Sequence, residues 1–255
     1  MKTSDFDYDL PEELIAQTPL ADRSASRLLA VDRKTGTYED KHFYDILDYL
    51  NPGDCLVMND SKVLPARIYG VKDVTGAKIE FLLHHQEELK VWEVMARPGK
   101  RLKPGTIVHF PCGLDAEVLE KREDGLIKVR FSCEEDFFAV LHKIGTMPLP
   151  PYIKERLTDQ DRYQTVYARE EGSCAAPTAG LHMTKALLEK IAHKGVKIVY
   201  VTLHVGLGTF LPVSEEDVSR HKMHTEYYEI SQSAAKMINE TKAGGGRVIA
   251  VGTTS

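Results

Sequence analysis

The 255-residue chain is 42% hydrophobic and 8% aromatic, a composition typical of a soluble globular protein with one large or two ordinary domains, and its formal net charge is −5. That charge argues against a protein that coats nucleic acid, because such binding depends on many contacts from Lys and Arg to phosphate. The chain does not open with a basic segment followed by an apolar one, and no apolar run approaches the roughly 18 residues of a membrane span. We therefore expect a cytoplasmic protein that does not enter a membrane.

The first predicted elements are short. Residues 10–17 predict a helix, since a proline stands near its start and acidic residues lie in its first turn. Residues 28–31 and the turn that follows them predict a hairpin. Residues 42–50 repeat apolar side chains at helical spacing, and residues 55–58 predict a buried strand.

An inserted domain is predicted over residues 62–149. Apolar and polar residues alternate there in short segments separated by turns, which is the pattern of a small antiparallel β-barrel. Residues 134–144 then predict a helix, and the proline-rich residues 147–151 predict a return linker. The predicted strands of this domain are residues 79–83, 91–95, 106–110 and 126–131.

Helix and strand alternate after the linker, so we assign residues 1–61 and 150–255 to one α/β domain. The chain is thus predicted to be a mixed α/β protein, with a barrel-like main domain and an inserted small antiparallel β-barrel. Residues 247–251 form a strand that is apolar on both faces, and such strands are normally covered by helices on both sides. We therefore expect the natural protein to continue beyond Ser255. The other predicted elements of this half are helices at residues 184–193 and 231–242 and an apolar strand at residues 196–201.

Four polar segments lie where an apolar element gives way to a loop, which is where open α/β sheets place their ligands. In the segment of residues 202–210, Gly206 and Gly208 would let the backbone approach a carboxylate or a sugar oxygen closely. The third glycine of a dinucleotide-binding fingerprint is missing, so a structural turn is the alternative to a ligand loop. The segments are residues 59–62, 176–182, 202–210 and 221–227.

Four histidines in these segments are candidates for proton transfer, because imidazole titrates near neutral pH. They could instead bind a metal or be structural, although the His-x-x-His pair lacks the glutamate of an H-E-x-x-H motif and Lys222 lies beside it. Glu226 and Asp60 are also ambiguous, since each could be a general base or a carboxylate that caps a helix or forms an ion pair. The histidines are His182, His204, His221 and His224.

The segment best suited to nucleic acid is residues 97–105, which has four basic residues, no acidic one, and turn residues that would hold it at a barrel rim. Residues 62–149 carry a net charge near +1, whereas the rest of the chain is near −6. Positive potential is thus concentrated in the inserted domain, and contact with phosphate is predicted there, with a solvated loop as the alternative. The basic residues are Arg97, Lys100, Arg101 and Lys103.

Motifs along the whole chain point to one family. They occupy residues 6–11, 14–17, 59–63, 65–67, 97–105, 175–182, 202–210, 221–226 and 245–255. Taken together, they resemble the S-adenosylmethionine:tRNA ribosyltransferase-isomerases of the queuosine pathway. Cys174 stands where that family more often has alanine, and Met183 stands where an aromatic residue is usual. Family members continue beyond residues 252–255 with further motifs, which is a second reason to expect a longer natural chain.

The resemblance implies a monomeric enzyme that acts on tRNA carrying 7-aminomethyl-7-deazaguanine at the wobble position. It would transfer and rearrange the ribosyl moiety of S-adenosylmethionine to give epoxyqueuosine, and would release adenine and methionine. S-adenosylmethionine would be a substrate, and neither a metal nor a permanently bound cofactor is expected.

The resemblance also assigns expected roles to residues. The expected catalytic residues, for proton transfer and sugar contacts, are His182, His204, His224 and Glu226. The expected substrate-binding residues are Asp60, Thr178, Gly180, Gly206, Gly208 and Thr209. The expected tRNA-binding residues are Arg97, Lys100, Arg101 and Lys103. Two alternatives are a metal-dependent hydrolase built on the four histidines and a non-catalytic tRNA-binding module.

Overall fold

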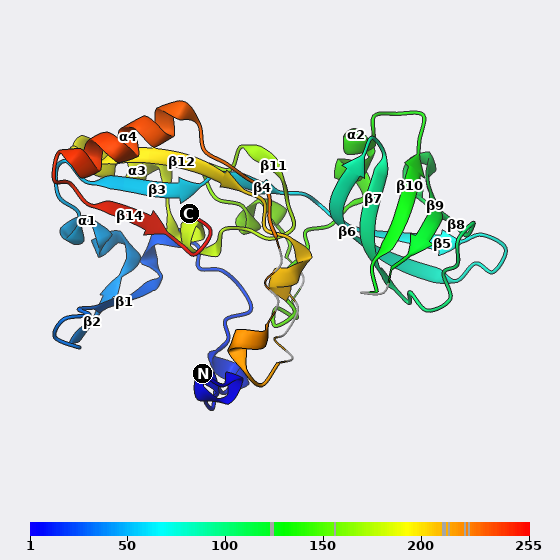
Figure 1. The fold of residues 1–255 in the computed structure, drawn as a ribbon, viewed down its shortest axis with the longest axis horizontal. Coiled ribbons are helices and arrows are strands. Elements are labelled where there is room, and N and C mark those ends of the chain that lie inside the picture. The colour runs from blue at the N-terminus through cyan, green and yellow to red at the C-terminus, as the bar shows by residue number, and fades with distance from the viewer. Residues whose placement is uncertain (123–124, 156, 211–212, 214, 222, 224) are drawn as a thin grey trace. The chain divides into compact units, whose positions relative to one another are not determined.

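The structure is a computed structural model that describes residues 1–255 apart from residues 123–124, 156, 211–212, 214, 222 and 224 (Figure 1). The chain divides into two compact units. The α/β unit comprises Met1–Lys62 and Pro151–Ser255, and the barrel unit comprises Val63–Pro150. The predicted fold class, mixed α/β with an inserted antiparallel barrel, is confirmed.

A four-stranded sheet forms the centre of the α/β unit. Strand β3 (Cys55–Asn59) lies between β12 (Lys197–Leu203) and β14 (Val248–Val251) and pairs with both in the parallel direction. Strand β13 (Tyr228–Glu229) pairs with β12 in the antiparallel direction. All three apolar strands predicted for this unit are therefore present.

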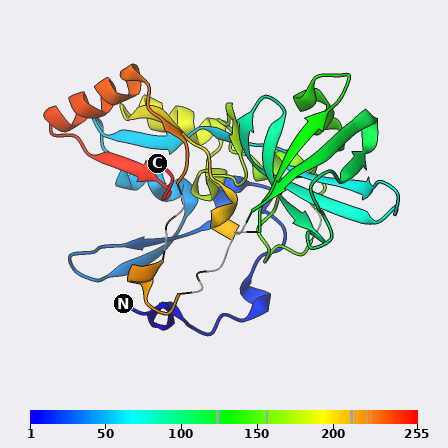
Figure 2. The same cartoon turned by 45° about the vertical axis from the view of Figure 1, so that its right-hand side comes forward.

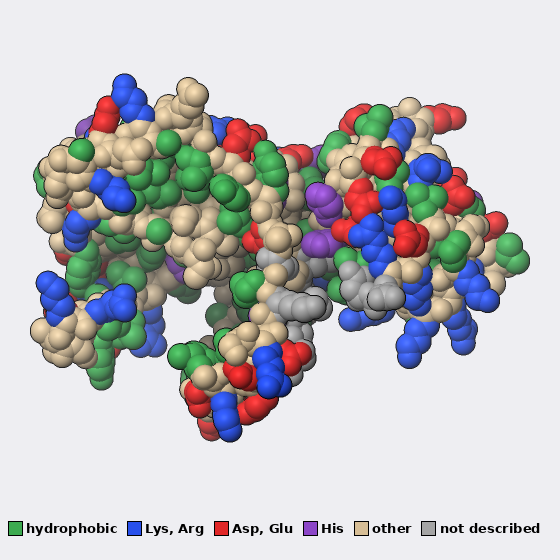
Figure 3. Space-filling model, in the orientation of Figure 1, with side chains coloured by type: hydrophobic (Ala, Val, Ile, Leu, Met, Phe, Trp, Pro, Cys, Tyr) green, Lys and Arg blue, Asp and Glu red, His purple; other side chains and the backbone are tan. Residues whose placement is uncertain are grey.

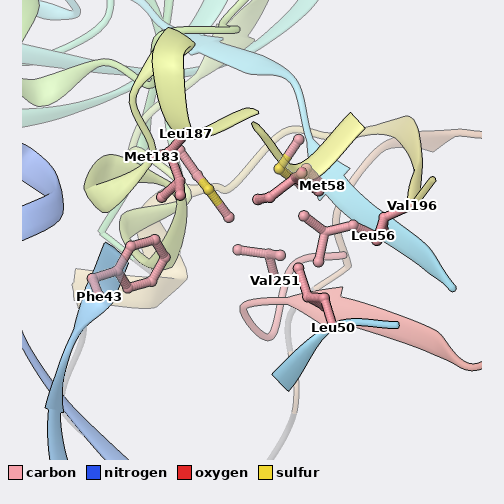
Figure 4. Close-up of a cluster of buried hydrophobic side chains, with 9 residues drawn as sticks. Phe43, Leu50, Leu56, Met58, Met183, Leu187, Val196 and Val251 are labelled. Carbon is pink, nitrogen blue, oxygen red and sulfur yellow. The ribbon is translucent and has the colours of Figure 1, made fainter. Parts of the chain in front are cut away.

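Strand β3 is buried on both faces, because successive residues of a strand point to opposite sides of the sheet. Leu56 and Met58 pack with α3 (Lys185–His193). Cys55 and Val57 pack with α4 (Gln232–Ala243) on the other face. Figure 4 shows the first of these two clusters, with the labelled side chains turned toward one another. The sheet thus lies between two helices.

Capping side chains set the starts of both helices. Thr184 Oγ1 accepts a hydrogen bond from Leu187 N at 3.1 Å, and Ser231 Oγ accepts one from Ala234 N at 3.2 Å. Each bond satisfies an N–H group that has no partner within the first helical turn. Both helices predicted after the return linker, at residues 184–193 and 231–242, are therefore confirmed.

The N-terminal part differs from its prediction. The helix expected over residues 10–17 is only a 3₁₀ turn, Glu12–Leu14. Leu14 is 70% exposed, so this segment buries no apolar face, and short helices in water depend on such burial. The predicted hairpin is confirmed as β1 (Arg27–Val31) and β2 (Tyr38–His42), and Figure 2 shows it as a separate two-stranded ribbon.

The helix predicted over residues 42–50 is divided into a 3₁₀ turn and the short helix α1 (Ile46–Tyr49). The described 3₁₀ turns of the chain are Thr3–Phe6, Glu12–Leu14, Arg23–Ala25, Phe43–Asp45, Pro111–Gly113, Gln160–Tyr163, Thr178–His182, Leu207–Phe210 and Val218–Arg220.

Strand β14 lies at an edge of the sheet, where β3 is its one neighbouring strand among the described residues. Val251 is buried in the same cluster as Leu56, but Val248 is exposed. An edge strand has a neighbouring strand on one side only, which leaves part of its surface in contact with solvent.

Six antiparallel strands close the barrel in the order β10-β7-β6-β5-β8-β9. The sequence pattern predicts four of them and misses β5 and β9. Acidic residues occupy outward positions of β9 and a glycine interrupts β5, and both features are depleted in strands. The bounds are β5 (Arg67–Lys72), β6 (Lys78–Glu88), β7 (Val91–Arg97), β8 (Ile107–Phe110), β9 (Leu114–Lys121) and β10 (Ile127–Ser132).

Helix α2 (Phe137–Ile144) packs on this barrel through aromatic rings. The Phe137 ring centroid lies 5.0 Å from that of Phe131 and 5.6 Å from that of Trp92. The predicted helix is thus confirmed, with Asp136 as its cap. Among the helices that the structure describes, none is both long enough and apolar enough to cross a membrane.

Candidate active site and nucleic-acid surface

Asp60 is a buried carboxylate at the ends of two parallel strands. It follows β3 and is 1% exposed. Its Oδ1 accepts a hydrogen bond of 2.8 Å from Thr202 Oγ1 on β12, and its Oδ2 lies 2.8 Å from Arg169 Nη2. The backbone N–H groups of Arg169 and Glu170 both donate to its carbonyl oxygen. The carboxyl ends of β3 and β12 and the start of β11 (Glu170–Ser173) therefore meet here, at the edge of the sheet where α/β proteins bind ligands.

Asn59 holds the same strand ends together. Its Nδ2 donates to the Leu203 carbonyl at 2.8 Å, and its Oδ1 accepts from the backbone N–H groups of Leu203 and Ser61 at 3.1 and 2.9 Å. Strand β4 (Ser61–Val63), which follows, pairs with β11. Since both ends of its amide are engaged, Asn59 serves to position the site, a role that its place in a polar segment did not reveal.

His204 follows β12 and is half-buried. Its backbone N–H donates to the Tyr227 carbonyl at 2.9 Å, and the two rings stack with centroids 5.7 Å apart. Its Nδ1 is buried and has no hydrogen-bond partner among the described residues. Burial lowers the pKa of His204, and the negative charges of Asp60 and Glu170 oppose this shift in part. The ring is therefore neutral near pH 7 and lies where carboxylates would stabilise its protonated form.

Glu226 is tied to the glycine loop that follows β12. The Gly206 N–H donates to Glu226 Oε1 at 2.8 Å, so two of the predicted polar segments are brought together. Gly208 is partly buried and Thr209 is exposed, and the Thr209 N–H turns back to the Gly206 carbonyl at 3.3 Å. His224, which was expected to be catalytic, lies outside the described residues.

The polar segment predicted at residues 176–182 contains the 3₁₀ turn Thr178–His182. Gly180 is buried in this turn, and a β-carbon at that position would overlap the Tyr167 hydroxyl. Thr178 is exposed. Gly180 is thus required by packing, whereas Thr178 is open to a ligand.

His182 is held by residues from the N-terminal part. Its Nδ1 lies 3.0 Å from Ser26 Oγ, and its ring centroid lies 5.1 Å from that of Phe43. Burial lowers the pKa of His182, against a hydrogen bond with the Arg23 backbone that raises it. Among the described residues, no hydrogen bond or ring contact joins His182 to His204.

The metal-binding alternative rested on four histidines, of which His224 lies outside the described residues. Among the residues that the structure describes, no group of three or more His, Cys, Asp or Glu side chains is placed to hold a metal ion. His221 is partly buried after the 3₁₀ turn Val218–Arg220.

Most of the buried side-chain polar atoms that lack a hydrogen-bond partner among the described residues lie in the α/β unit. Nine such side-chain atoms occur among the described residues. Six of them belong to Asp60, Ser61, His204 and residues 163–167, which precede β11. An unpaired buried polar group costs about 1–3 kcal/mol, so a group of them points to a site that a ligand completes. The atoms are Asp60 Oδ2, which is in the Arg169 ion pair without a hydrogen bond, Ser61 Oγ, Tyr163 Oη, Thr165 Oγ1, Tyr167 Oη and His204 Nδ1.

The basic loop of the barrel unit is anchored by Leu102, which is buried. The basic residues of this loop form no ion pair with a described residue. In the same unit, by contrast, Lys128 pairs with Glu87 at 2.7 Å and Lys143 pairs with Glu135 at 2.6 Å. Unpaired, exposed positive charge is suited to phosphate. The residues, all exposed, are Arg97, Lys100, Arg101 and Lys103.

Two further lysines, which the sequence did not single out, reach this loop. Lys72 Nζ donates to the Arg101 carbonyl at 3.2 Å, and Lys121 Nζ donates to the Gly99 carbonyl at 3.5 Å. They end β5 and β9, the two strands that the sequence pattern misses, so only barrel closure places them beside the loop. Figure 3 shows Lys and Arg side chains gathered along one edge of the barrel unit.

The fold and these sites define an α/β protein with a buried polar cluster around Asp60 and an inserted barrel that carries a basic surface. The sequence model described as "Queuosine biosynthesis protein" matches residues 3–255. Among solved structures, S-adenosylmethionine tRNA ribosyltransferase from Thermotoga maritima is 35% identical, with 97% of this chain and 69% of that chain covered and a TM-score of 0.43. The chain therefore belongs to the queuosine biosynthesis protein family, as its motifs predicted, and it is an enzyme. This membership does not favour the metal-dependent hydrolase or the non-catalytic module.

Proposed function

We propose that the protein transfers the ribosyl moiety of S-adenosylmethionine to 7-aminomethyl-7-deazaguanine at the wobble position of tRNA and rearranges it to epoxyqueuosine. Adenine and methionine leave in this reaction, and S-adenosylmethionine is a substrate rather than a resident cofactor. The enzyme acts in the cytoplasm as a monomer. Family membership supports this reaction, and the structural observation that carries it is the buried site around Asp60 and His204 at the ends of the parallel strands.

The sulfonium group of the donor sets what the site must do. Positive sulfur acidifies the hydrogens on the adjacent ribose C5′ and is itself a good leaving group. The enzyme therefore needs a base for the C5′ proton, a proton donor for the departing adenine and a pocket that excludes water. His204 suits the base, because burial keeps it neutral and the carboxylates of Asp60 and Glu170 would stabilise the imidazolium that forms.

Other residues hold the substrates. We assign Glu226 to positioning the glycine loop, because its carboxylate already accepts the Gly206 N–H. A carboxylate has about four lone-pair sites, so Asp60 can still accept the adjacent N–H groups of a deazaguanine. His182 and Thr178, at the two ends of one 3₁₀ turn, are assigned to sugar hydroxyls. His224 is proposed as a proton donor on the family resemblance alone.

Release of adenine tests this function. The protein is mixed with S-adenosylmethionine and with tRNA that carries the modified base, and free adenine is measured. We expect steady release from the unsubstituted protein and about 10²-fold slower release from His204→Ala, since loss of a general base typically costs that much. His193→Ala is the control, because His193 is exposed on α3 and its ring bonds the Glu189 carbonyl one turn earlier in the same helix. Binding of tRNA without any adenine release would instead indicate a binding module.

The basic loop is proposed to bind tRNA phosphates. Replacing Lys100 and Arg101 together by Ala should weaken tRNA binding and reduce the slope of log Kd against log salt by roughly 1.5 to 2, because each lost phosphate contact removes about one released counterion. The control replaces Arg130 and Lys143, which are basic residues of the same unit that are ion-paired. Filter binding over a series of salt concentrations gives both slopes, and equal slopes for the two double variants would dismiss the loop.

A further inference from the structure

The segment that precedes β11 buries polar residues that the sequence motifs did not mark. Thr165 is 5% exposed, and Tyr167 packs its ring against that of Tyr200 with centroids 5.5 Å apart. Neither the Thr165 nor the Tyr167 hydroxyl has a hydrogen-bond partner among the residues that the structure describes. Both hydroxyls therefore have hydrogen-bonding capacity that the described residues leave unused.

Both side chains lie directly against the 3₁₀ turn that carries Thr178 and His182. A β-carbon at Gly180 would overlap the Tyr167 hydroxyl and would lie 3.1 Å from Thr165 Cγ2. Thr165 and Tyr167 thus both contact the turn at Gly180. They belong to the same unit as Asp60. Burial, followed by the charges of Tyr200 and Asp60, raises the pKa of Tyr167, so its hydroxyl keeps its proton at all physiological pH values.

We propose that the Thr165 and Tyr167 hydroxyls bind the ribose hydroxyls of the nucleoside donor. A ribose diol offers two groups that each donate and accept, and threonine and tyrosine hydroxyls have the same double capacity. Both hydroxyls are neutral, whereas a carboxylate or phosphate is bound most strongly by charged donors, so this pair suits a sugar diol better than the donor's own carboxylate or a tRNA phosphate. This assignment rests on the proposed function, since it takes the donor to be S-adenosylmethionine.

Near-isosteric substitutions test the assignment. Tyr167→Phe and Thr165→Val should each raise the Kd for S-adenosylmethionine, measured by calorimetry, by about 3- to 10-fold, the usual loss for one neutral hydrogen bond. For donor analogues that lack the ribose 2′- or 3′-hydroxyl, one of the two substitutions should have no further effect, because its partner is already absent. Tyr49→Phe is the control, since its hydroxyl bonds the exposed Glu39 at 3.3 Å and should leave the Kd unchanged.

A second measurement separates ligand binding from a structural role. Without ligand, Tyr167→Phe and Thr165→Val should unfold at the same temperature as the parent or higher, because an unpaired buried hydroxyl costs stability. A clear drop in melting temperature would mean that the hydroxyls have structural partners, and would overturn the assignment. Parent-like Kd values for both variants would also overturn it while the proposed function stands. A parent protein that neither binds S-adenosylmethionine nor releases adenine would overturn both.

Discussion

Gly180 illustrates how one residue couples packing to the candidate site. The space that its side chain would fill is taken by the Tyr167 hydroxyl, with the Tyr167 Cζ at 3.0 Å and Thr165 Cγ2 at 3.1 Å. Overpacking a buried position typically costs 1–3 kcal/mol, so Gly180→Ala should destabilise the protein by about 2 kcal/mol in urea unfolding.

Removing the clashing oxygen should restore part of that loss. Gly180→Ala combined with Tyr167→Phe is expected to be more stable than Gly180→Ala alone, although the ring carbon keeps the contact tight. Gly180→Ala combined with Tyr49→Phe is the control and should show no recovery. Equal stability of the two double variants would contradict the packing seen here.

The residues of the candidate site were partly predictable. Asp60, His204, Gly206 and Glu226 stand out in the sequence because they lie in polar segments after apolar strands, and the structure joins three of these segments by hydrogen bonds. Thr165 and Tyr167 carry no such pattern. Their importance depends on buried atoms without partners and on a glycine 13 residues further along the chain, which only the fold reveals.

At the scale of elements, the predictions succeeded where a local signal agreed with burial. Strand β3 is a continuous apolar run that is buried on both faces. Helices α3 and α4 have apolar residues at helical period and capping side chains at their starts. The helix expected over residues 10–17 had start signals but no buried face, so only one turn formed. Strands β5 and β9 had weak local signals, and they form because barrel closure supplies partners on both sides.

An ion pair fastens the edge strand β14 to the centre of the α/β unit. Asp54 is 3% exposed and accepts hydrogen bonds from the Arg247 side chain, from the Asn51 N–H at 2.8 Å and from the Arg247 N–H at 3.1 Å. The side-chain hydrogen bond from Arg247 is the largest cause that lowers the pKa of Asp54, from 3.8 to about 2. A pKa held lower in the folded state contributes stability above the unfolded value, here about 2 kcal/mol, and loses it as pH falls from about 4 toward 2.

At the scale of the whole molecule, this pair allows a test of whether the two units unfold independently. Trp92 is the one tryptophan of the chain and is buried in the barrel unit, so its fluorescence reports that unit alone. Asp54→Ala should lower the stability of the α/β unit by about 2 kcal/mol at pH 7, seen as faster hydrogen exchange in β3 and β14. The Trp92 fluorescence midpoint in urea should stay unchanged, because each unit has its own core.

Asp40→Ala, which removes an exposed ion pair with Arg27, is the control and should alter neither the hydrogen exchange nor the fluorescence midpoint. A Trp92 midpoint that falls together with the protection of β3 would mean instead that the inserted barrel and the α/β unit unfold as one cooperative body.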